Sequence, residues 1–352
     1  MLIRIYSSEG PAFSHKDHRS DRPQPEAPSV LGATPMQSST TPSGPRSFWI
    51  GTLCYLNAAF VWGLNIPLTS ALFASFDPFW LAPLRLSIAS CLLAMAVLLS
   101  LGSASLKSPI PAGRVLLMSL CVSCFFTLYN LGLLHSNTIT AAAIMAGSPV
   151  YGAVTTRLMT GAKLEKGFWG AALLTMIGAS IAIYGRSERN DQGLMLEGGE
   201  ILIVLSIAAW TAYSILSQRW FPTDVPQLQR TFLTTLGSIP CLLVFWLIAW
   251  SSGVVGAPNF HPSAEALRNL FITAAFSTAL GAVTWNIGVA RLGINAGVMW
   301  QNTVPVFAVL ISLVAFQVQP MPEQMLGGCV VLSGVLYMQW HKLRLSRAPN
   351  QT

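Results

Sequence analysis

The sequence predicts an all-α polytopic membrane protein with ten transmembrane helices arranged as two inverted five-helix repeats. The first observation is composition. Of the 352 residues, 53% are hydrophobic and only 9% are charged, whereas a soluble domain carries about 25% charged residues. The second observation is a succession of ten apolar segments, and the third is a motif that occurs once in each half of the chain.

Each apolar segment is long enough to cross about 30 Å of hydrocarbon, which takes roughly 20 helical residues. The segments lie at 48–72, 78–101, 113–134, 138–159, 167–185, 197–219, 229–252, 267–289, 295–317 and 323–341. The first five-helix repeat accordingly covers 48–185 and the second covers 197–341. Residues 1–47, rich in Pro, Ser and Thr, cannot bury enough apolar surface to order themselves, which predicts a disordered cytoplasmic tail. Residues 342–352 form a second cytoplasmic tail.

The repeated motif is aromatic-Asn-x-Gly, followed by a Pro. Residues 129–132 (Tyr-Asn-Leu-Gly) precede Pro149, residues 285–288 (Trp-Asn-Ile-Gly) precede Pro305, and a shift of 156 residues superposes the two copies without a gap. Five is an odd number of spans, so the second repeat enters the membrane from the opposite side and the repeats are inverted. Each Pro interrupts its apolar segment, and can serve as a hinge or as a packing kink.

The positive charges predict the orientation. With the N-terminus in the cytoplasm, 16 of the 20 Lys and Arg residues lie in cytoplasmic segments, 3 lie outside and Arg85 lies within a span. The positive-inside rule therefore predicts that both termini are cytoplasmic. Residues 187–192 and 259–263 are expected outside, and residues 163–166 inside. The expected location is the plasma (inner) membrane, and the net charge of +7 is an orientation signal.

Several short motifs resemble those of the EamA-type transporters of the drug/metabolite transporter superfamily. They are Trp62-Gly63-Leu64-Asn65, Pro83-Leu84-Arg85-Leu86, Pro149, Gly199-Glu200-Ile201-Leu202, Trp210, Arg219, Pro305 and the stretch from Gly327 to Gly334. The resemblance covers 48–341 and implies ten helices in two inverted repeats. The family commonly carries Leu-Gly-Glu after the proline-containing helix of each half. Here residues 159–162 read Met-Thr-Gly-Ala and residues 316–319 read Phe-Gln-Val-Gln, so no role is carried over for that carboxylate.

Ionisable groups are scarce inside the predicted spans. None of the 13 acidic residues and no His lies mid-span, so a proton relay of the Asp/Glu/His kind is not expected. Arg85 is the one buried charge, and its guanidinium fork suits a carboxylate or a phosphate of the substrate. The alternative is a structural Arg that bonds helix-end carbonyls or reaches the interface. Glu200 is a candidate for an outer gate or, alternatively, a helix-terminal charge favoured by the macrodipole.

The remaining candidates are mid-span amides and the aromatic residues beside them. We expect them to line a central cavity for a small polar or amphipathic solute, with hydrogen bonding between helices as the alternative. The set is Trp62, Asn65, Tyr129, Asn130, Trp210, Trp285, Asn286, Trp300, Gln301 and Asn302. A slightly different shift aligns Trp62 of the first repeat with Trp210 of the second. Asn130 and Asn286 are repeat equivalents and are expected to face one cavity from opposite repeats.

These features predict a secondary transporter, and not an enzyme. It moves a small metabolite (an amino-acid-like, amine or drug-like solute) by alternating access, in the direction of efflux. The sequence contains no phosphate loop, metal cluster or nucleophile–base pair, so no cofactor or metal is expected. The expected partners are the small-molecule substrate and the lipid bilayer, with no nucleic acid and with a homodimer left open. The alternatives are a membrane-embedded enzyme or scaffold without transport, and a passive channel.

Overall fold

The computed structural model describes residues 44–135, 144–145, 147–161, 163, 167–187, 198–316 and 322–347. These residues belong to one compact unit, which covers 38–352. The expected tail at 1–47 falls almost wholly outside the described residues. So do parts of the links expected at 163–166 and 187–192, and residues 348–352 of the expected C-terminal tail.

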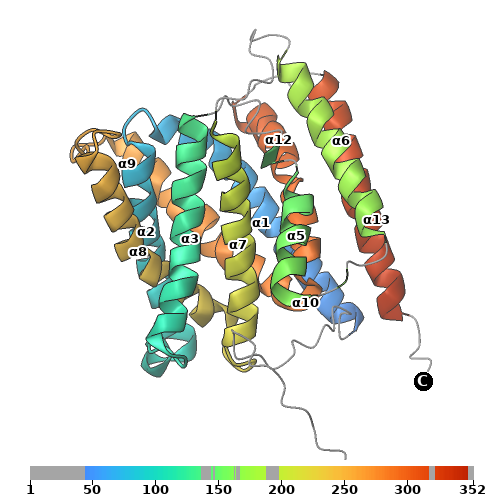
Figure 1. Ribbon diagram of the computed structural model, residues 1–352, viewed down its shortest axis with the longest axis horizontal. Helices are drawn as coiled ribbons and strands as arrows, with labels where there is room; N and C mark the ends of the chain where they lie inside the picture. Colours follow the sequence, from blue (N-terminus) through green and yellow to red (C-terminus); the bar gives the residue numbers. More distant parts are fainter. Residues whose placement is uncertain are drawn as a thin grey trace, which may run out of the picture. The chain divides into compact units, whose positions relative to one another are not determined.

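Every regular element of the described residues is helical (Figure 1). The elements are α1 (Pro45–Leu72), α2 (Pro78–Leu101), the 3-10 helix η1 (Ser103–Leu106), α3 (Ala112–Leu134), α5 (Ser148–Thr160), α6 (Phe168–Ser187), α7 (Glu200–Trp220), α8 (Gln227–Ser251), α9 (Ala264–Ile272), the π-helix η2 (Thr273–Leu280), α10 (Gly281–Leu292), α11 (Ile294–Gln301), α12 (Val304–Phe316) and α13 (Pro322–Arg347).

The helices fall where the apolar segments predict them, most within a few residues. Six helical stretches of the described chain are long and apolar enough to cross a membrane, and they lie in α1, α2, α3, α7, α8 and the continuous rod of α9, η2 and α10. The other predicted segments fall on α5, α6, the α11–α12 pair and α13. Shorter apolar stretches occur there at Phe168–Gly178 and Met325–Tyr337.

Both proline interruptions predicted from the sequence are confirmed. α11 ends at Gln301, a turn follows, and α12 begins at Val304, next to Pro305. In the first half of the chain α5 begins at Ser148, with Pro149 in its first turn. A Pro has no N–H to donate to the preceding turn, so a helix tends to start at it. A hinge role for the two prolines stays a prediction.

The segment predicted at 267–289 contains a π-helix that the sequence did not indicate. In η2 the hydroxyl of Thr278 lies 3.4 Å from the carbonyl oxygen of Thr273, five residues earlier. Ser277 Oγ donates to the carbonyl of Val61 at 2.8 Å, and the Ser277 carbonyl accepts from Trp62 Nε1 at 3.0 Å. Single π-helical turns often occur at functional sites. Here the π segment is tied directly to α1.

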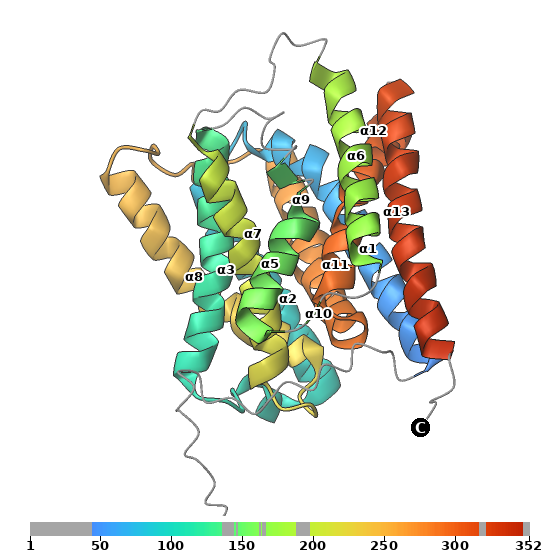
Figure 2. The ribbon, with the colours of Figure 1, turned by 45° about the vertical axis from the view of Figure 1, so that its right-hand side comes forward.

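Close neighbours in space come from opposite halves of the chain. α1 packs against α10 and α12, whereas α7 packs against α3 and α5. α2 packs against α8, and α6 against α13, which lie side by side in both Figure 1 and Figure 2. Under the predicted repeat, the pair α1–α10 corresponds to α7–α3, and the pair α1–α12 to α7–α5.

The glycine of the repeated motif makes the same kind of contact in both copies. A Cβ at Gly132 of α3 would fall 2.5 Å from Ile203 Cγ1 of α7, and a Cβ at Gly288 of α10 would fall 2.6 Å from the ring of Tyr55 on α1. Small residues at helix crossings let two backbones approach closely. Gly is therefore required in both copies by the helix that crosses there.

We expect Gly288→Ala to lower the free energy of unfolding by about 1–3 kcal/mol, because overpacking a fitted contact forces neighbours out of their rotamers. Tyr55 has no room to yield, since it is 1% exposed and its hydroxyl donates to the Gly293 carbonyl at 2.8 Å. Gly113→Ala is the control, because a Cβ there has nothing within 4 Å. Thermal unfolding of the purified proteins measures both, and equal melting temperatures would contradict the prediction.

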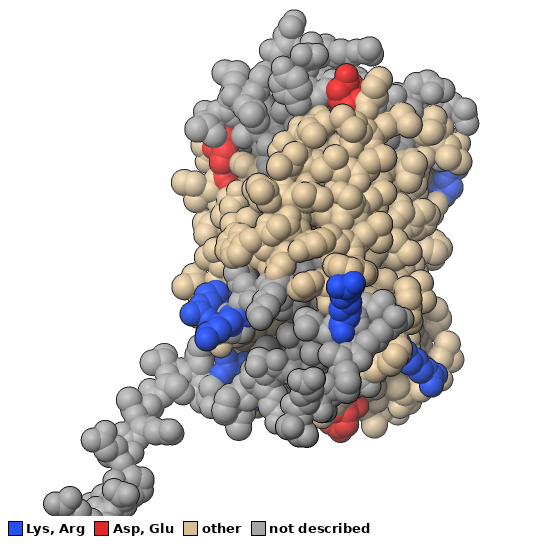
Figure 3. All heavy atoms as spheres, turned by 90° about the vertical axis from the view of Figure 1, so that its right-hand side faces the viewer, with Lys and Arg blue, Asp and Glu red and all other residues tan. Residues whose placement is uncertain are grey.

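The charged side chains and the exposed apolar ones indicate which part faces lipid. In Figure 3 a broad band of uncharged residues separates most of the Lys and Arg atoms, below it, from most of the Asp and Glu atoms, above it. Large apolar side chains stand exposed on the helices, among them Leu99 at 83% and Leu158 at 81%. Such surfaces are costly in water and favourable against acyl chains.

Candidate functional site

A buried arginine lies at the meeting point of three helical elements. Arg85 of α2 is 8% exposed. Its Nη2 donates to Asn65 Oδ1 of α1 at 2.9 Å and to Thr278 Oγ1 of η2 at 3.1 Å, and its Nη1 lies 3.4 Å from Thr69 Oγ1 of α1. We call these four residues the arginine node. The node brings together two of the residues expected from the sequence, Asn65 and Arg85.

Local sequence signals position the node. Asp77 caps α2 by accepting from the backbone N–H groups of Phe79 and Trp80, both at 2.9 Å, and Pro78 opens the helix. Arg85 then follows two turns below the cap. Asn65 and Thr69 stand four residues apart, so they share one face of α1. Thr69 Oγ1 donates to Asn65 Oδ1 at 3.0 Å, which turns the amide oxygen toward the guanidinium.

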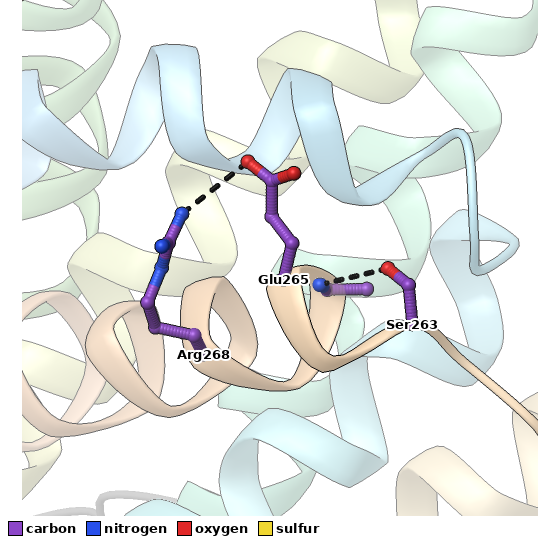
Figure 4. A network of polar contacts seen from close by, with 4 residues as sticks. Ser263, Glu265 and Arg268 are labelled. Atoms are coloured by element: carbon purple, nitrogen blue, oxygen red, sulfur yellow. Dashed lines mark hydrogen bonds and ion pairs between the residues drawn. The ribbon is translucent and has the colours of Figure 1, made fainter.

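Among the residues that the structure describes, the guanidinium of Arg85 meets only neutral oxygen atoms, and its buried Nε has no hydrogen-bond partner there. Within the described ranges the one salt bridge is between Glu265 and Arg268 at the start of α9, at 3.3 Å, beside the Ser263 cap (Figure 4). Both of its side chains are exposed, 73% and 64%. A buried charge without an opposite charge is costly unless a partner arrives. The node is therefore suited to receive an anion.

Aromatic side chains continue the site beyond the node. The rings of Trp62, Trp210 and Trp285 contact one another, with centroids 5.3 to 6.1 Å apart. Phe125 of α3 lies 5.2 Å from Trp210 and stacks with Tyr129 at 6.0 Å. We call these five residues the aromatic cluster. It contains four of the expected residues, Trp62, Tyr129, Trp210 and Trp285, and Trp62 meets Trp210, its counterpart under the repeat.

The node and the cluster are joined through α1 and η2. Trp62 stands one turn before Asn65 on α1 and donates its Nε1 hydrogen to the carbonyl of Ser277, which directly precedes Thr278. Trp285 Nε1 donates to Ser214 Oγ at 3.1 Å. Trp210 Nε1 is buried and has no hydrogen-bond partner in the described part of the chain. The guanidinium of Arg85, the apolar rings of the aromatic cluster and the Trp210 N–H donor thus occur in the same part of the protein.

The two motif asparagines are not brought together. Asn130 lies near the end of α3, and its Nδ2 donates to the Pro78 carbonyl at 3.0 Å. At the same end of α3, the His135 carbonyl accepts from the N–H of Gly199, the residue just before α7. Asn286 is fully buried, and its Nδ2 donates to Tyr213 Oη at 2.8 Å and to Thr231 Oγ1 at 2.9 Å. Tyr213 lies thirteen residues into α7, which is about 20 Å further along the helix.

Three further candidates lie around the turn between α11 and α12. Trp300 is 6% exposed, and its buried Nε1 has no hydrogen-bond partner within the described ranges. Asn302 is 4% exposed and accepts at Oδ1 from Ser148 Oγ, at 3.3 Å. Gln301 is half-buried. Ser148 precedes Pro149, so the two proline interruptions of the chain meet at this hydrogen bond.

Glu200 is engaged with its own helix start. Its Oε2 accepts from the backbone N–H of Gly198 at 2.9 Å, and it stands in the first turn of α7. A carboxylate in the first turn is favoured by the helix macrodipole. The gate role expected for Glu200 stays a prediction.

A cavity of about 480 Å³ lies between α2, α9 and the loop before α9. Trp80 and Leu84 line it from α2, Phe260 and His261 from the loop, and Leu267 from α9. Leu84 directly precedes Arg85, whose own hydrogen bonds run to α1 and η2. The cavity therefore adjoins the arginine node without including it.

Three members of the site were not among the sequence candidates. Thr69 could have been found, because it follows Asn65 by four residues on a helix. Phe125 could have been found in the same way, because it precedes Tyr129 by four residues on α3. Thr278 had no signal of its own, since its position depends on the π-helix. In the part of the chain that the structure describes, no group of three or more His, Cys, Asp or Glu residues could hold a metal ion.

An all-helical chain with a lipid-facing apolar surface and a buried polar site is a multi-pass membrane protein. The family model of the EamA-like transporter family matches residues 49–184 and matches a second time at 197–340. The chain therefore belongs to the EamA-like transporter family, which confirms the resemblance found in its motifs. Membership makes it a membrane transporter rather than an enzyme.

Curated relatives are named in the same terms. The chain is 24% identical over 212 residues to the uncharacterized transporter YyaM of Bacillus subtilis (strain 168), covering 60% of this chain and 68% of that one. It is 21% identical over 278 residues to the uncharacterized transporter YrdR of the same organism, covering 76% and 84%. It is also 24% identical over 264 residues to a probable terminal-alkyne amino-acid exporter of Streptantibioticus cattleyicolor, covering 72% and 80%.

The fold also has a counterpart among solved structures. One solved crystal structure matches this chain with a TM-score of 0.70 at 19% sequence identity, and the match covers 86% of this chain and 99% of that chain. At this identity the likeness shows the fold alone.

Proposed function

We propose that the protein is a secondary transporter that exports a small organic solute by alternating access between two inverted five-helix repeats. The double match of the family model and the correspondence of the α1–α10 and α7–α3 pairs support the repeat. The charge distribution supports cytoplasmic termini in the plasma membrane. A relative named as an exporter supports the direction.

The two motif asparagines support the alternating-access part of the proposal. Asn130 ties α3 to the start of α2, and Asn286 ties α10 to the start of α8. Under the predicted repeat, α2 and α3 correspond to α8 and α10. Because the repeats are inverted, the two equivalent contacts lie on opposite sides of the membrane. Breaking one contact at a time opens one side while the other stays closed, which is what alternating access requires. In this role the asparagines control access to the site instead of lining it.

The substrate-binding part of the proposal rests on Arg85. A buried guanidinium with three neutral oxygen partners and a free Nε retains an unsatisfied charge. An Arg within a membrane segment that is held this way marks a substrate path. We propose that Arg85 binds a carboxylate or another anionic group of the solute, with the aromatic cluster against the remainder.

The test begins with a thermal-shift screen of the purified protein against carboxylates, phosphates, amines and amino acids, because a ligand of the folded state raises its stability. The best ligand is then used in counterflow uptake by proteoliposomes. Arg85→Lys should lower uptake about tenfold at a nearly unchanged melting temperature, because Lys keeps the charge and loses the fork. Arg268→Lys, at an exposed Arg, is the matched control. Full uptake by an Arg85→Ala protein of normal stability would refute the role.

A further inference from the structure

The structure shows which charges surround the node. Of the acidic residues described, Asp77 caps α2, Glu265 pairs with Arg268, and Glu200 accepts from the Gly198 N–H. None of the described acids bonds to Arg85, and the three partners of Arg85 are an amide and two hydroxyls. The node therefore holds one formal positive charge and no negative charge of its own.

The node also has little to offer a second cation. Asn65 Oδ1 already accepts from both Arg85 and Thr69, and Thr278 Oγ1 accepts from Arg85. An ammonium group placed there would compete with the guanidinium for the same oxygens and would be repelled by it. Desolvating a second charge without a counter-ion adds a further cost. The rings of the aromatic cluster contact one another at centroid distances of 5.3 to 6.1 Å and offer an apolar surface without an anionic group that could pair with an ammonium group.

We infer that the transported solute is a net monoanion, with one carboxylate at Arg85, an apolar or aromatic body against Trp62, Trp210 and Trp285, and no ammonium group. This inference rests on the proposed role of Arg85 and goes beyond it, because a zwitterionic amino acid would satisfy that role equally well. It separates this chain from the relative named as an amino-acid exporter.

The test uses pairs of probes that differ only in the amino group. 3-Phenylpropionate and phenylalanine share one skeleton, phenethylamine carries the amine without the carboxylate, and octanoate with 2-aminooctanoate form an aliphatic pair. Binding to the purified full-length protein is measured by thermal shift and by the fluorescence of its tryptophans. We expect each simple carboxylate to bind at least tenfold more tightly than its amino acid, with phenethylamine weakest, and Arg85→Gln to abolish this order.

Each other outcome has a defined meaning. If phenylalanine binds as tightly as 3-phenylpropionate and both lose affinity in Arg85→Lys, the inference of a monoanion is overturned and the anion-binding role of Arg85 stands. If the affinities are the same in wild type, Arg85→Lys and Arg85→Gln, both are overturned. Failure of both carboxylates to bind also overturns the inference. Arg85→Lys preserves the charge, so it remains informative if Arg85→Gln does not fold.

Discussion

Replacing Arg230 by Met is expected to lower the free energy of unfolding by about 3 kcal/mol or more. The Arg230 side chain is 3% exposed and closes the link between α7 and α8. Its Nε donates to the Val225 carbonyl at 2.9 Å, its Nη1 to the Ser217 carbonyl at 3.2 Å and its Nη2 to the Pro222 carbonyl at 2.7 Å. Hydrogen bonds from a charged donor are each worth about 1.5–3 kcal/mol, and the last carbonyls of α7 have no partner within their own helix.

The matched control is Arg219→Met, one position before the end of α7, where the half-buried side chain makes none of these bonds. Thermal and denaturant unfolding in detergent should show a large drop for the Arg230 variant and a small change for the Arg219 variant. Similar stabilities of the two variants would show that the carbonyl contacts of Arg230 contribute little.

The second large effect is expected at the motif asparagines. Asn286→Ala removes two hydrogen bonds at a fully buried position and leaves the hydroxyls of Tyr213 and Thr231 without that partner. We expect the start of α8, residues 227–234, to open more often, with amide hydrogen exchange there faster by roughly 5- to 150-fold. Asn130→Ala should act in the same way, but more weakly, on residues 79–86 of α2, because Asn130 is half-buried and makes one bond.

Asn57→Ala is the control for this experiment, because Asn57 donates to Thr284 across α1 and α10 and touches neither helix start. Its exchange at 79–86 and 227–234 should match that of the wild type. Uniformly faster exchange in all three variants would mean that the asparagines stabilise the protein generally and do not control its two ends separately.

The sequence was informative wherever the signal is local. Apolar length placed the helices, and the two prolines placed the interruptions at α5 and at the α11–α12 turn, because a missing N–H acts on the preceding turn. Arg85 was predicted as a buried charge because charges inside apolar segments are rare, and it is buried. The prediction that it is the one buried charge was wrong, because Arg230 is 3% exposed at the start of α8. The Arg85 partner Thr278 was not predictable, since the π-helix η2 forms against α1, more than 200 residues away.

The arrangement of Asn130 and Asn286 shows a different limit. Equivalent residues of inverted repeats meet only when they lie at the midplane. Asn130 stands four residues before the end of α3, so its equivalent belongs at the opposite end. The motif predicted one shared cavity. The structure shows each asparagine bonded near the start of a neighbouring helix, Asn130 at α2 and Asn286 at α8. Trp62 and Trp210, which do meet, each lie ten residues before the end of their helix.

The exchange of packing partners between the two halves also affects how the chain is made. Of these helices α1 is synthesised first, yet its main partners α10 and α12 come more than 200 residues later. α3 likewise waits for its partners α7 and α8, and the buried hydroxyls of Ser119 and Ser123 donate to backbone carbonyls of α8. The first half thus enters the bilayer with its polar faces uncovered. Long-range pairing of this kind delays final packing until synthesis is nearly complete, and a nascent chain that stops midway is left as a target for quality control.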